Sequence, residues 1–155
     1  MSSKRFSDDD PVFEKIRRKR KEFYTYENIF SREEVELMKS QVFGSIHTID
    51  DSKIRGFHEK DNYSTIKIRP GVVITSPSKE TNFETEWVPM SSKIYNRNLR
   101  EVVFLERYKE DVVQDSVILL RYRGWYKFKT LSKRKGKLSY EKQKELIEKL
   151  NKINF

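Results

Sequence analysis

The apolar positions of this chain follow two different spacings. From Ser31 to about Phe43 they recur at helical spacing. This range begins with a Ser-x-x-Glu pattern, which is typical of a capped helix N-terminus. From about Ser45 to Phe128 they tend to alternate, with β-branched and aromatic residues between turn-forming residues, which indicates strands. Helical spacing returns from Ser139 to about Asn151. The order is therefore one helix, a run of strands and a final helix.

The alternating part divides into short segments that are separated by turn-forming residues. We expect strands at Ser45 to Ile49, Lys53 to Phe57, Ser64 to Arg69, Val72 to Thr75, Phe83 to Val88, Glu101 to Tyr108 and Ser116 to Phe128. Pro70-Gly71 predicts a turn, and Gly124 predicts a bulge or bend in the last strand. Parallel crossovers need a dozen or more residues, so these short connections favour antiparallel pairing. The prediction is an α+β fold: an antiparallel sheet of about five to seven strands, one helix before it and one C-terminal helix.

The first 22 residues look different from the rest. They carry eight basic and five acidic side chains, and they include the basic run Arg17, Arg18, Lys19, Arg20 and Lys21. We expect residues 1–22 to form a flexible charged arm and residues 23–155 to form a single domain. The basic run resembles a nuclear localisation signal and can act as a secondary polyanion contact, which predicts a nuclear protein if the host is eukaryotic.

Composition excludes several classes of protein. The chain has no cysteine, so it can form neither a disulfide framework nor a thiolate site. The N-terminus is charged where a secretory signal would be apolar, and no apolar run approaches the length of a membrane span. These features predict an intracellular protein that does not contact a membrane.

The positive charge is concentrated at the C-terminal end. Residues 121–155 hold 12 basic and three acidic side chains, an excess equal to the whole net charge of +9, while residues 23–120 hold 13 basic and 16 acidic ones. A solvated surface spreads its charge, whereas a polyanion-binding surface concentrates it. The sequence therefore predicts a partner such as DNA or RNA for the C-terminal third.

The segment from Arg121 to Lys129 combines cations with aromatic residues. On an extended chain, alternation would place four cations and one indole on the same face, provided that Gly124 does not shift the phase. Cations can meet phosphates, and an exposed tryptophan can stack on a base. The segment also resembles, over about six residues, the first ribonucleoprotein signature of RNA-recognition domains. The predicted nucleic-acid-binding residues are Arg121, Arg123, Trp125, Lys127, Lys129, Lys133, Arg134, Lys135 and Lys137.

A metal-dependent phosphohydrolase is the enzymatic alternative. Three pairs of residues would each share one strand face: Glu84 and Glu86, Lys67 and Arg69, and Arg121 and Arg123. This pattern is similar to that of the tunnel-shaped metal-dependent triphosphatases. That family uses a second strand with two glutamates, whereas here Glu34-Val35-Glu36 falls on the predicted helix. A charged solvent-facing strand alternates in the same way.

The remaining polar residues carry weaker signals. His47 and His58 have no further histidine or cysteine at ligand spacing, which disfavours a zinc site, and no glycine-rich phosphate loop is present. Ser76-Pro77 and the Ser7-Asp8-Asp9 segment resemble kinase sites, which predicts a phosphoprotein.

We therefore expect a noncatalytic nucleic-acid-binding protein, or a nucleic-acid-bound subunit of a larger complex, that is not an enzyme and needs no cofactor or metal. A protein–protein interaction subunit of a nuclear complex is the alternative.

Overall fold

The computed structural model describes residues 29–57, 67–95 and 97–153. The chain divides into two compact units, Met1–Glu36 and Leu37–Phe155, which are described separately. The basic run Arg17 to Lys21 and the predicted domain boundary after residue 22 lie outside the described residues, as does His58. The basic arm and the domain boundary therefore stay predictions.

The predicted N-terminal helix is present as α2, Arg32–Ser40. Its capping box forms in both directions: the Ser31 N–H donates to Glu34 Oε1 at 2.9 Å, and the Glu34 N–H donates to Ser31 Oγ at 3.1 Å. The helix ends at Ser40 rather than near Phe43. The next residue, Gln41, is fully buried and its amide donates to the Phe128 carbonyl, so the chain has already turned toward the sheet.

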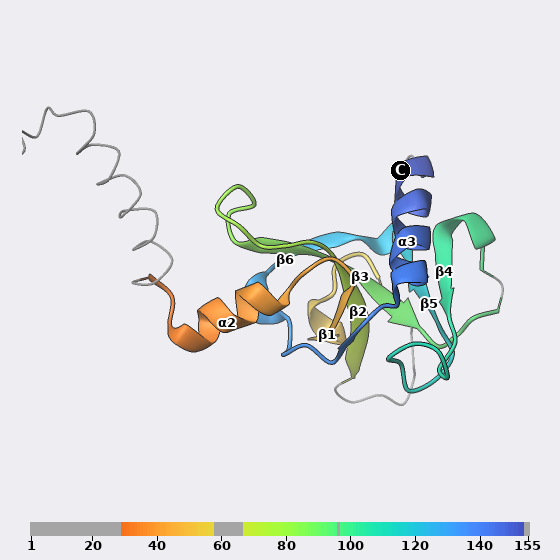
Figure 1. The fold of residues 1–155 in the computed structure, drawn as a ribbon, viewed down its shortest axis with the longest axis horizontal. Helices are drawn as coiled ribbons and strands as arrows, with labels where there is room; N and C mark the ends of the chain where they lie inside the picture. The colour runs from red at the N-terminus through yellow and green to blue at the C-terminus, as the bar shows by residue number, and fades with distance from the viewer. Residues whose placement is uncertain (1–28, 58–66, 96, 154–155) are drawn as a thin grey trace, which may run out of the picture. The chain divides into compact units, whose positions relative to one another are not determined.

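Among the described residues of the second unit, seven strands form a curled sheet (Figure 1). They are β1 (Ser45–Asp50), β2 (Ile68–Thr75), β3 (Glu84–Ser91), β4 (Val102–Leu105), β5 (Ser116–Leu119), β6 (Gly124–Lys127) and β7 (Gly136–Lys137). Their order is β4-β5-β3-β2-β1-β7, with β6 also paired to β3, and each pairing among the described strands is antiparallel. The predicted α+β class, with its antiparallel sheet and flanking helices, is confirmed.

Two of the local predictions between Lys53 and Gly71 were wrong. The expected strand at Lys53 to Phe57 is instead a short 3₁₀ turn, Asp51–Lys53, followed by bends, because the Asp50 carboxylate accepts the Ser52 N–H at 3.0 Å. Pro70-Gly71 is not a turn but lies inside β2. A Cβ atom at Gly71 would lie 2.2 Å from the Trp87 ring, so this glycine serves the close approach of the indole rather than a turn.

The long strand expected over Ser116 to Phe128 is broken. Residues Leu120–Tyr122 form a 3₁₀ turn between β5 and β6, and both strands pair with β3 on the edge opposite β2. The interruption lies before Gly124, the position where a bulge or bend was expected, and Gly124 itself is the first residue of β6 and pairs with Trp87. The 3₁₀ turn therefore ends the alternation before β6 begins.

Two apolar clusters hold the sheet together. One includes Ile46, Val88 and Leu146, and Leu146 comes from the C-terminal helix α3 (Tyr140–Lys152). The other surrounds Trp87, whose fully buried ring meets Tyr126 edge to face at 5.8 Å. The predicted cap of α3 is confirmed, since Ser139 Oγ accepts the Lys142 N–H at 3.3 Å. Among the described residues no helix has the length and apolar character needed to cross a membrane.

Candidate functional site

A cavity of about 650 Å³ lies where the start of β2 meets the end of β3. The loop that follows β4 contributes residues 110–114 to its wall, and the segment before β7 contributes Lys135. The polar side chains that line it are Thr48, Lys67, Arg69, Ser91, Ser92, Glu110, Asp111, Gln114, Ser116 and Lys135. Cations, carboxylates and hydroxyls therefore converge on one hollow that the antiparallel register creates.

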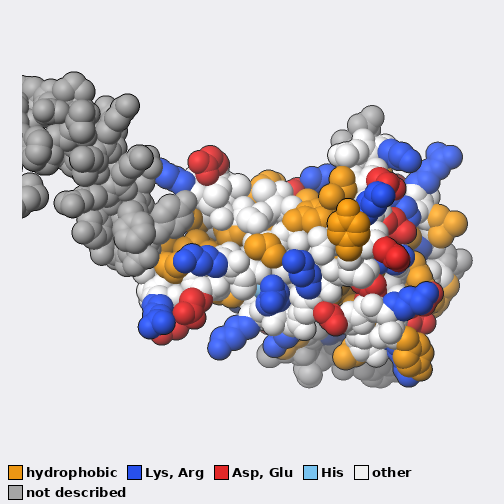
Figure 2. Space-filling model, in the orientation of Figure 1, with side chains coloured by type: hydrophobic (Ala, Val, Ile, Leu, Met, Phe, Trp, Pro, Cys, Tyr) orange, Lys and Arg blue, Asp and Glu red, His pale blue; other side chains and the backbone are white. Residues whose placement is uncertain are grey.

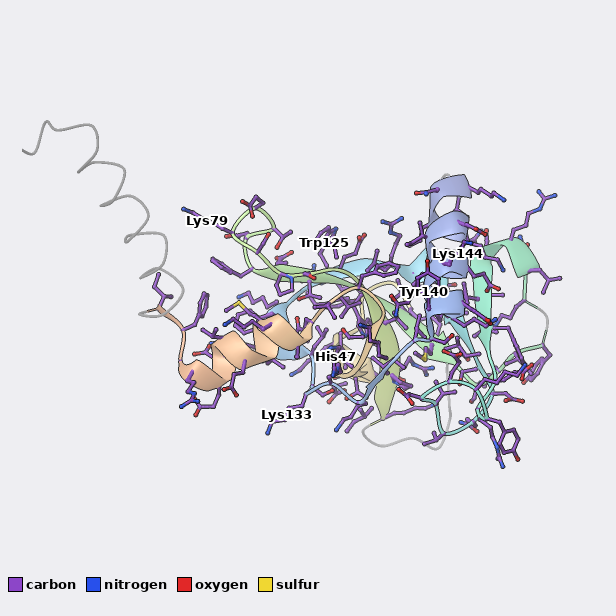
Figure 3. All side chains as sticks on the ribbon, viewed as in Figure 1. His47, Lys79, Trp125, Lys133, Tyr140 and Lys144 are labelled. Atoms are coloured by element: carbon purple, nitrogen blue, oxygen red, sulfur yellow. The ribbon has the colours of Figure 1, made fainter. Side chains whose placement is uncertain are left out.

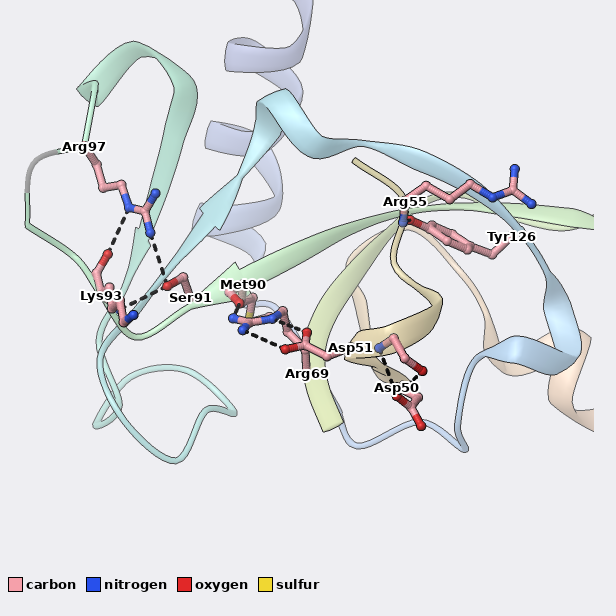
Figure 4. Close-up of polar contacts among 10 residues, drawn as sticks. Asp50, Asp51, Arg55, Arg69, Met90, Ser91, Lys93, Arg97 and Tyr126 are labelled. Atoms are coloured by element: carbon pink, nitrogen blue, oxygen red, sulfur yellow. Dashed lines mark hydrogen bonds and ion pairs between the residues drawn. The ribbon is translucent and has the colours of Figure 1, made fainter. Parts of the chain in front are cut away.

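Arg69 is the most constrained of these side chains. It is only 3% exposed, and its Nε and Nη2 donate to the two carboxylate oxygens of Asp51 at 2.7 and 3.2 Å. Nη1 donates to the Met90 carbonyl at 3.1 Å (Figure 4). The guanidinium also lies 4.9 Å from the centre of the Phe57 ring. A bidentate carboxylate fixes both the position and the plane of a guanidinium. The guanidinium is thus held in one orientation in the cavity wall, beside the carboxylate that balances its charge.

Ser91 follows Met90 at the end of β3 and is 2% exposed. Its Oγ accepts the Lys93 N–H at 3.1 Å and Nη2 of Arg97 at 3.3 Å (Figure 4). Arg97 also donates from Nε to the Lys93 carbonyl at 2.9 Å. The serine hydroxyl is therefore held in place at the cavity wall, as the arginine is.

Two carboxylates fix the loop on the other side of the cavity. Asp111 Oδ2 accepts the Lys137 N–H at 3.0 Å, and Glu110 Oε1 accepts the Ser139 N–H at 2.8 Å. These bonds tie the loop to β7 and to the start of α3. Each carboxylate uses one oxygen in the bond named, so the group can also accept a proton from a bound molecule.

The sequence-predicted residues are not brought together on one face. Over the face in Figure 2, lysines and arginines alternate with acidic and apolar side chains. Arg121 lies in the 3₁₀ turn after β5 and donates to Glu101 at 3.0 Å. Arg123 is bound by both Glu86 oxygens, at 3.0 and 3.2 Å. Two of the four expected cations therefore already have carboxylate partners.

The rest of the predicted set divides between two parts of the sheet. Trp125 is 38% exposed on β6, where Lys127 is also exposed, and Lys129 follows in the next turn. The basic loop instead runs along β1, because the Lys135 N–H donates to the Ile46 carbonyl at 2.7 Å. Figure 3 shows Trp125 and Lys133 well apart. Lys133, Arg134 and Lys137 are exposed, and only Lys135 of the nine lines the cavity.

Sequence reasoning did not place Arg69 or Ser91 among the predicted binding residues, and it named Arg69 only in the metal-dependent alternative. Arg69 was placed at the end of a strand before a supposed turn, whereas it lies within β2 and next to buried residues. An arginine inside an otherwise apolar strand was the available signal, because a buried guanidinium needs a fixed partner.

Of the two glutamates in the enzymatic alternative, Glu86 has side-chain partners in the described part of the chain. Glu84 and Glu86 lie on β3, and Glu86 accepts from Arg123 and from the Thr75 hydroxyl. In the part of the chain that the structure describes, no group of three histidine, cysteine or carboxylate side chains could hold a metal ion. Glu86 therefore links β3 to Thr75 of β2 and to Arg123, which lies just before β6.

His47 is buried on β1, outside the cavity. Its Nδ1 contacts the Ser132 carbonyl at 2.8 Å and its Nε2 contacts Ser45 Oγ at 2.9 Å. A carbonyl can only accept, so Nδ1 carries the proton. Burial lowers the pKa of the imidazole below its ordinary value, with a smaller opposing effect from the Ser132 carbonyl. His47 holds the basic loop against β1.

Comparison with known proteins identifies the fold. No family model matches the sequence, and no curated protein is significantly similar to it. Among solved structures, the Mycobacterium tuberculosis toxin MazF-mt6 is similar with 16% identity and a TM-score of 0.51, over 70% of this chain and 93% of the toxin. The MazE-MazF structure from Deinococcus radiodurans is similar with 14% identity and a TM-score of 0.51, over 73% of this chain and 94% of the matched one.

This likeness corrects the functional expectation. We expected a noncatalytic nucleic-acid-binding protein, or an interaction subunit, that is not an enzyme, and that expectation is wrong because MazF toxins share the fold and give no precedent for such a role. Both matched proteins come from bacteria, which have no nucleus, so the expected nuclear localisation gains no support. The matches also give no support to DNA binding or phosphorylation. The described part of this chain has the fold of MazF toxins.

Proposed function

We propose that this protein is a MazF-like endoribonuclease that binds single-stranded RNA in the cavity around Arg69 and cleaves it there. The observation that carries the proposal is the buried Arg69 guanidinium, held by Asp51 and the Met90 carbonyl in the wall of a cavity of about 650 Å³. The MazF-like fold supports it from a separate direction.

The charges in the cavity suit a phosphodiester. Lys67, Arg69 and Lys135 line it with positive charge, while Glu110 and Asp111 are its two carboxylates. Arginine matches the geometry of phosphate oxygens and stays charged at every physiological pH. Lysines at the rim attract the backbone of a nucleic acid, and this attraction is weakened by salt.

RNA brings its own nucleophile to such a site. The 2′-oxygen attacks the adjacent phosphorus, its proton passes to a base, and the bond from phosphorus to the 5′-oxygen breaks as that oxygen takes up a proton. The protein then has to stabilise the negative charge that develops on the phosphoryl oxygens, and a preorganised cation does this at little reorganisation cost. Arg69 stabilises the charge on the phosphoryl oxygens, and Asp111 or Glu110 accepts the proton of the 2′-hydroxyl.

The surface on β6 is proposed as an additional contact of the same enzyme. Trp125 and Lys127 are exposed there, so an RNA strand can meet both a stacking surface and a cation. A protein partner also belongs to the proposal, since one structure of this fold contains MazF together with MazE.

The test compares substrates that differ only in the 2′-hydroxyl. Purified protein is incubated with a single-stranded RNA pool, with DNA of the same sequences and with duplex RNA, and the product ends are determined. We expect cleavage of single-stranded RNA alone, with a 2′,3′-cyclic phosphate on one product and a 5′-hydroxyl on the other. Intact RNA, or equal cleavage of RNA and DNA, would refute the proposed function.

A further inference from the structure

A second and smaller cavity, of about 330 Å³, is bounded by residues 97–102 and by the residues at the end of β5. Its charged lining consists of two guanidinium groups, Arg97 and Arg121, and the Glu101 carboxylate. Asn98 and Tyr122 add polar groups, and Val102 and Leu119 add apolar ones. The cavity thus offers positive charge, hydrogen-bonding groups and an apolar wall within one small volume.

Arg97 joins the two cavities. It lines the second cavity, while its Nη2 donates at 3.3 Å to the Oγ of Ser91, which lines the first. Figure 4 shows Arg97 and Ser91 in contact and Arg69 bound to Met90, the residue next along β3. A molecule bound at Arg69 therefore has the second cavity within reach on the far side of Ser91.

We propose that the second cavity binds one nucleotide of the same RNA strand, with Arg121 contacting its phosphate. The inference rests on the proposed function and specifies how the substrate is positioned. Single-stranded RNA is recognised through unstacked bases that enter pockets and hydrogen-bond along their edges. A cavity that combines arginines with an amide and a carboxylate suits a nucleotide better than it suits an apolar ligand.

Arg121 is placed to exchange its present partner for a phosphate. Its Nη2 meets Glu101 Oε1 at 3.0 Å, and the arginine side chain is 59% exposed. An exposed ion pair of this kind is weak, because water competes with both partners. A phosphate can approach the guanidinium from the solvent side and bind it in a bidentate manner. The Glu101 carboxylate then becomes available to accept from the amino group of a base.

The experiment compares Arg121→Ala with Arg107→Ala. Arg107 is an exposed arginine stacked on Tyr108, and it lines neither cavity. Cleavage sites are sequenced from a random single-stranded RNA pool, and kcat and KM are measured on the preferred sequence. Melting temperatures establish that each variant is folded, and Arg121→Lys replaces the alanine variant if that one does not fold.

We expect Arg121→Ala to raise KM about tenfold, as for the loss of a charged hydrogen bond, and to leave kcat nearly unchanged. It should also weaken the nucleotide preference at one position beside the cut, whereas Arg107→Ala changes neither quantity. Equal behaviour of the two variants would overturn the subsite. If wild-type protein binds RNA without cutting it, the proposed function fails and the subsite is judged by the same comparison of binding constants. If wild-type protein does not bind RNA, both proposals fall.

Discussion

Arg69 donates a hydrogen bond of 3.1 Å from Nη1 to the carbonyl oxygen of Met90, which joins β2 to the end of β3. Asp51 holds the same guanidinium from the other side with two hydrogen bonds. A cation that is fixed in advance can stabilise a developing negative charge without paying to reorganise. Arg69 therefore links β2 to β3 and also supplies the cation of the proposed chemistry.

The ion pair between Asp51 and Arg69 should contribute to stability. The side chains are 24% and 4% exposed, so Asp51→Asn leaves a nearly buried guanidinium with a weaker partner. We expect a loss of about 1–3 kcal/mol in the free energy of unfolding, measured in urea. The control is Glu36→Gln, which breaks an exposed pair with Arg32 and should cost less than about 0.5 kcal/mol. Equal losses would mean that Asp51 adds no more than a surface charge.

Asp111 should act in proton transfer. Asp111→Asn removes the carboxylate, while the amide oxygen can still accept the Lys137 N–H that fixes the loop. We expect kcat for RNA to fall about a hundredfold. Glu110→Gln, which changes the less exposed neighbour, should have a smaller effect. An unchanged kcat for Asp111→Asn would exclude Asp111 as the proton acceptor.

Trp125 and Trp87 should respond differently to replacement by alanine. Trp87 is fully buried, so its loss should cost about 3–5 kcal/mol of stability, whereas Trp125 is 38% exposed and should cost far less. If Trp125 stacks on a base, Trp125→Ala also lowers single-strand RNA affinity by about 1–3 kcal/mol without changing its salt dependence. Unfolding by heat and binding at several salt concentrations measure these effects. An unchanged affinity would remove β6 from the RNA contact surface.

His47 makes stability depend on pH. Its pKa is lowered by burial in the folded protein, so the unfolded chain binds the proton more readily below about pH 6.5. The contribution of the neutral His47 imidazole to the free energy of unfolding should therefore be fully present above that pH. It should decline as the pH falls toward the lowered pKa. Unfolding at pH 7.5 and 5.5 measures the change, and His47→Gln should reduce the difference between the two. A wild-type difference no larger than that of the variant would contradict this origin.

Local sequence patterns were sufficient for the elements that depend on neighbouring residues. Ser31 with Glu34 predicted one helix start, Ser139 predicted the other, and short connections predicted antiparallel pairing. The breaks around Asp51 and Leu120 were not predicted at their positions. The first depends on the hydrogen bond between the Asp50 carboxylate and Ser52, and the second depends on the pairing of both β5 and β6 with β3. Pro70-Gly71 resembled a turn only because the contact with Trp87 is made across the sheet.

The site depended on information that the linear sequence does not contain. Arg69 and Ser91 are neighbours because β2 and β3 pair in one register, with Gly71 opposite Pro89. A shift by one residue would turn the side chains of one strand to the opposite face. The charge excess of residues 121–155 did indicate a polyanion, but only Lys135 of the nine predicted residues lies in the cavity and Arg121 lies in its neighbour.

The rate at which Arg69 variants cleave single-stranded RNA tests the central claim most directly. Arg69→Lys keeps the charge without the bidentate geometry and Arg69→Gln removes the charge, while Arg55→Gln changes an exposed arginine outside the cavity. The account predicts that kcat falls at least about a hundredfold in both folded Arg69 variants and stays near the wild-type value in Arg55→Gln. Cleavage by folded Arg69→Gln at the wild-type rate would contradict it.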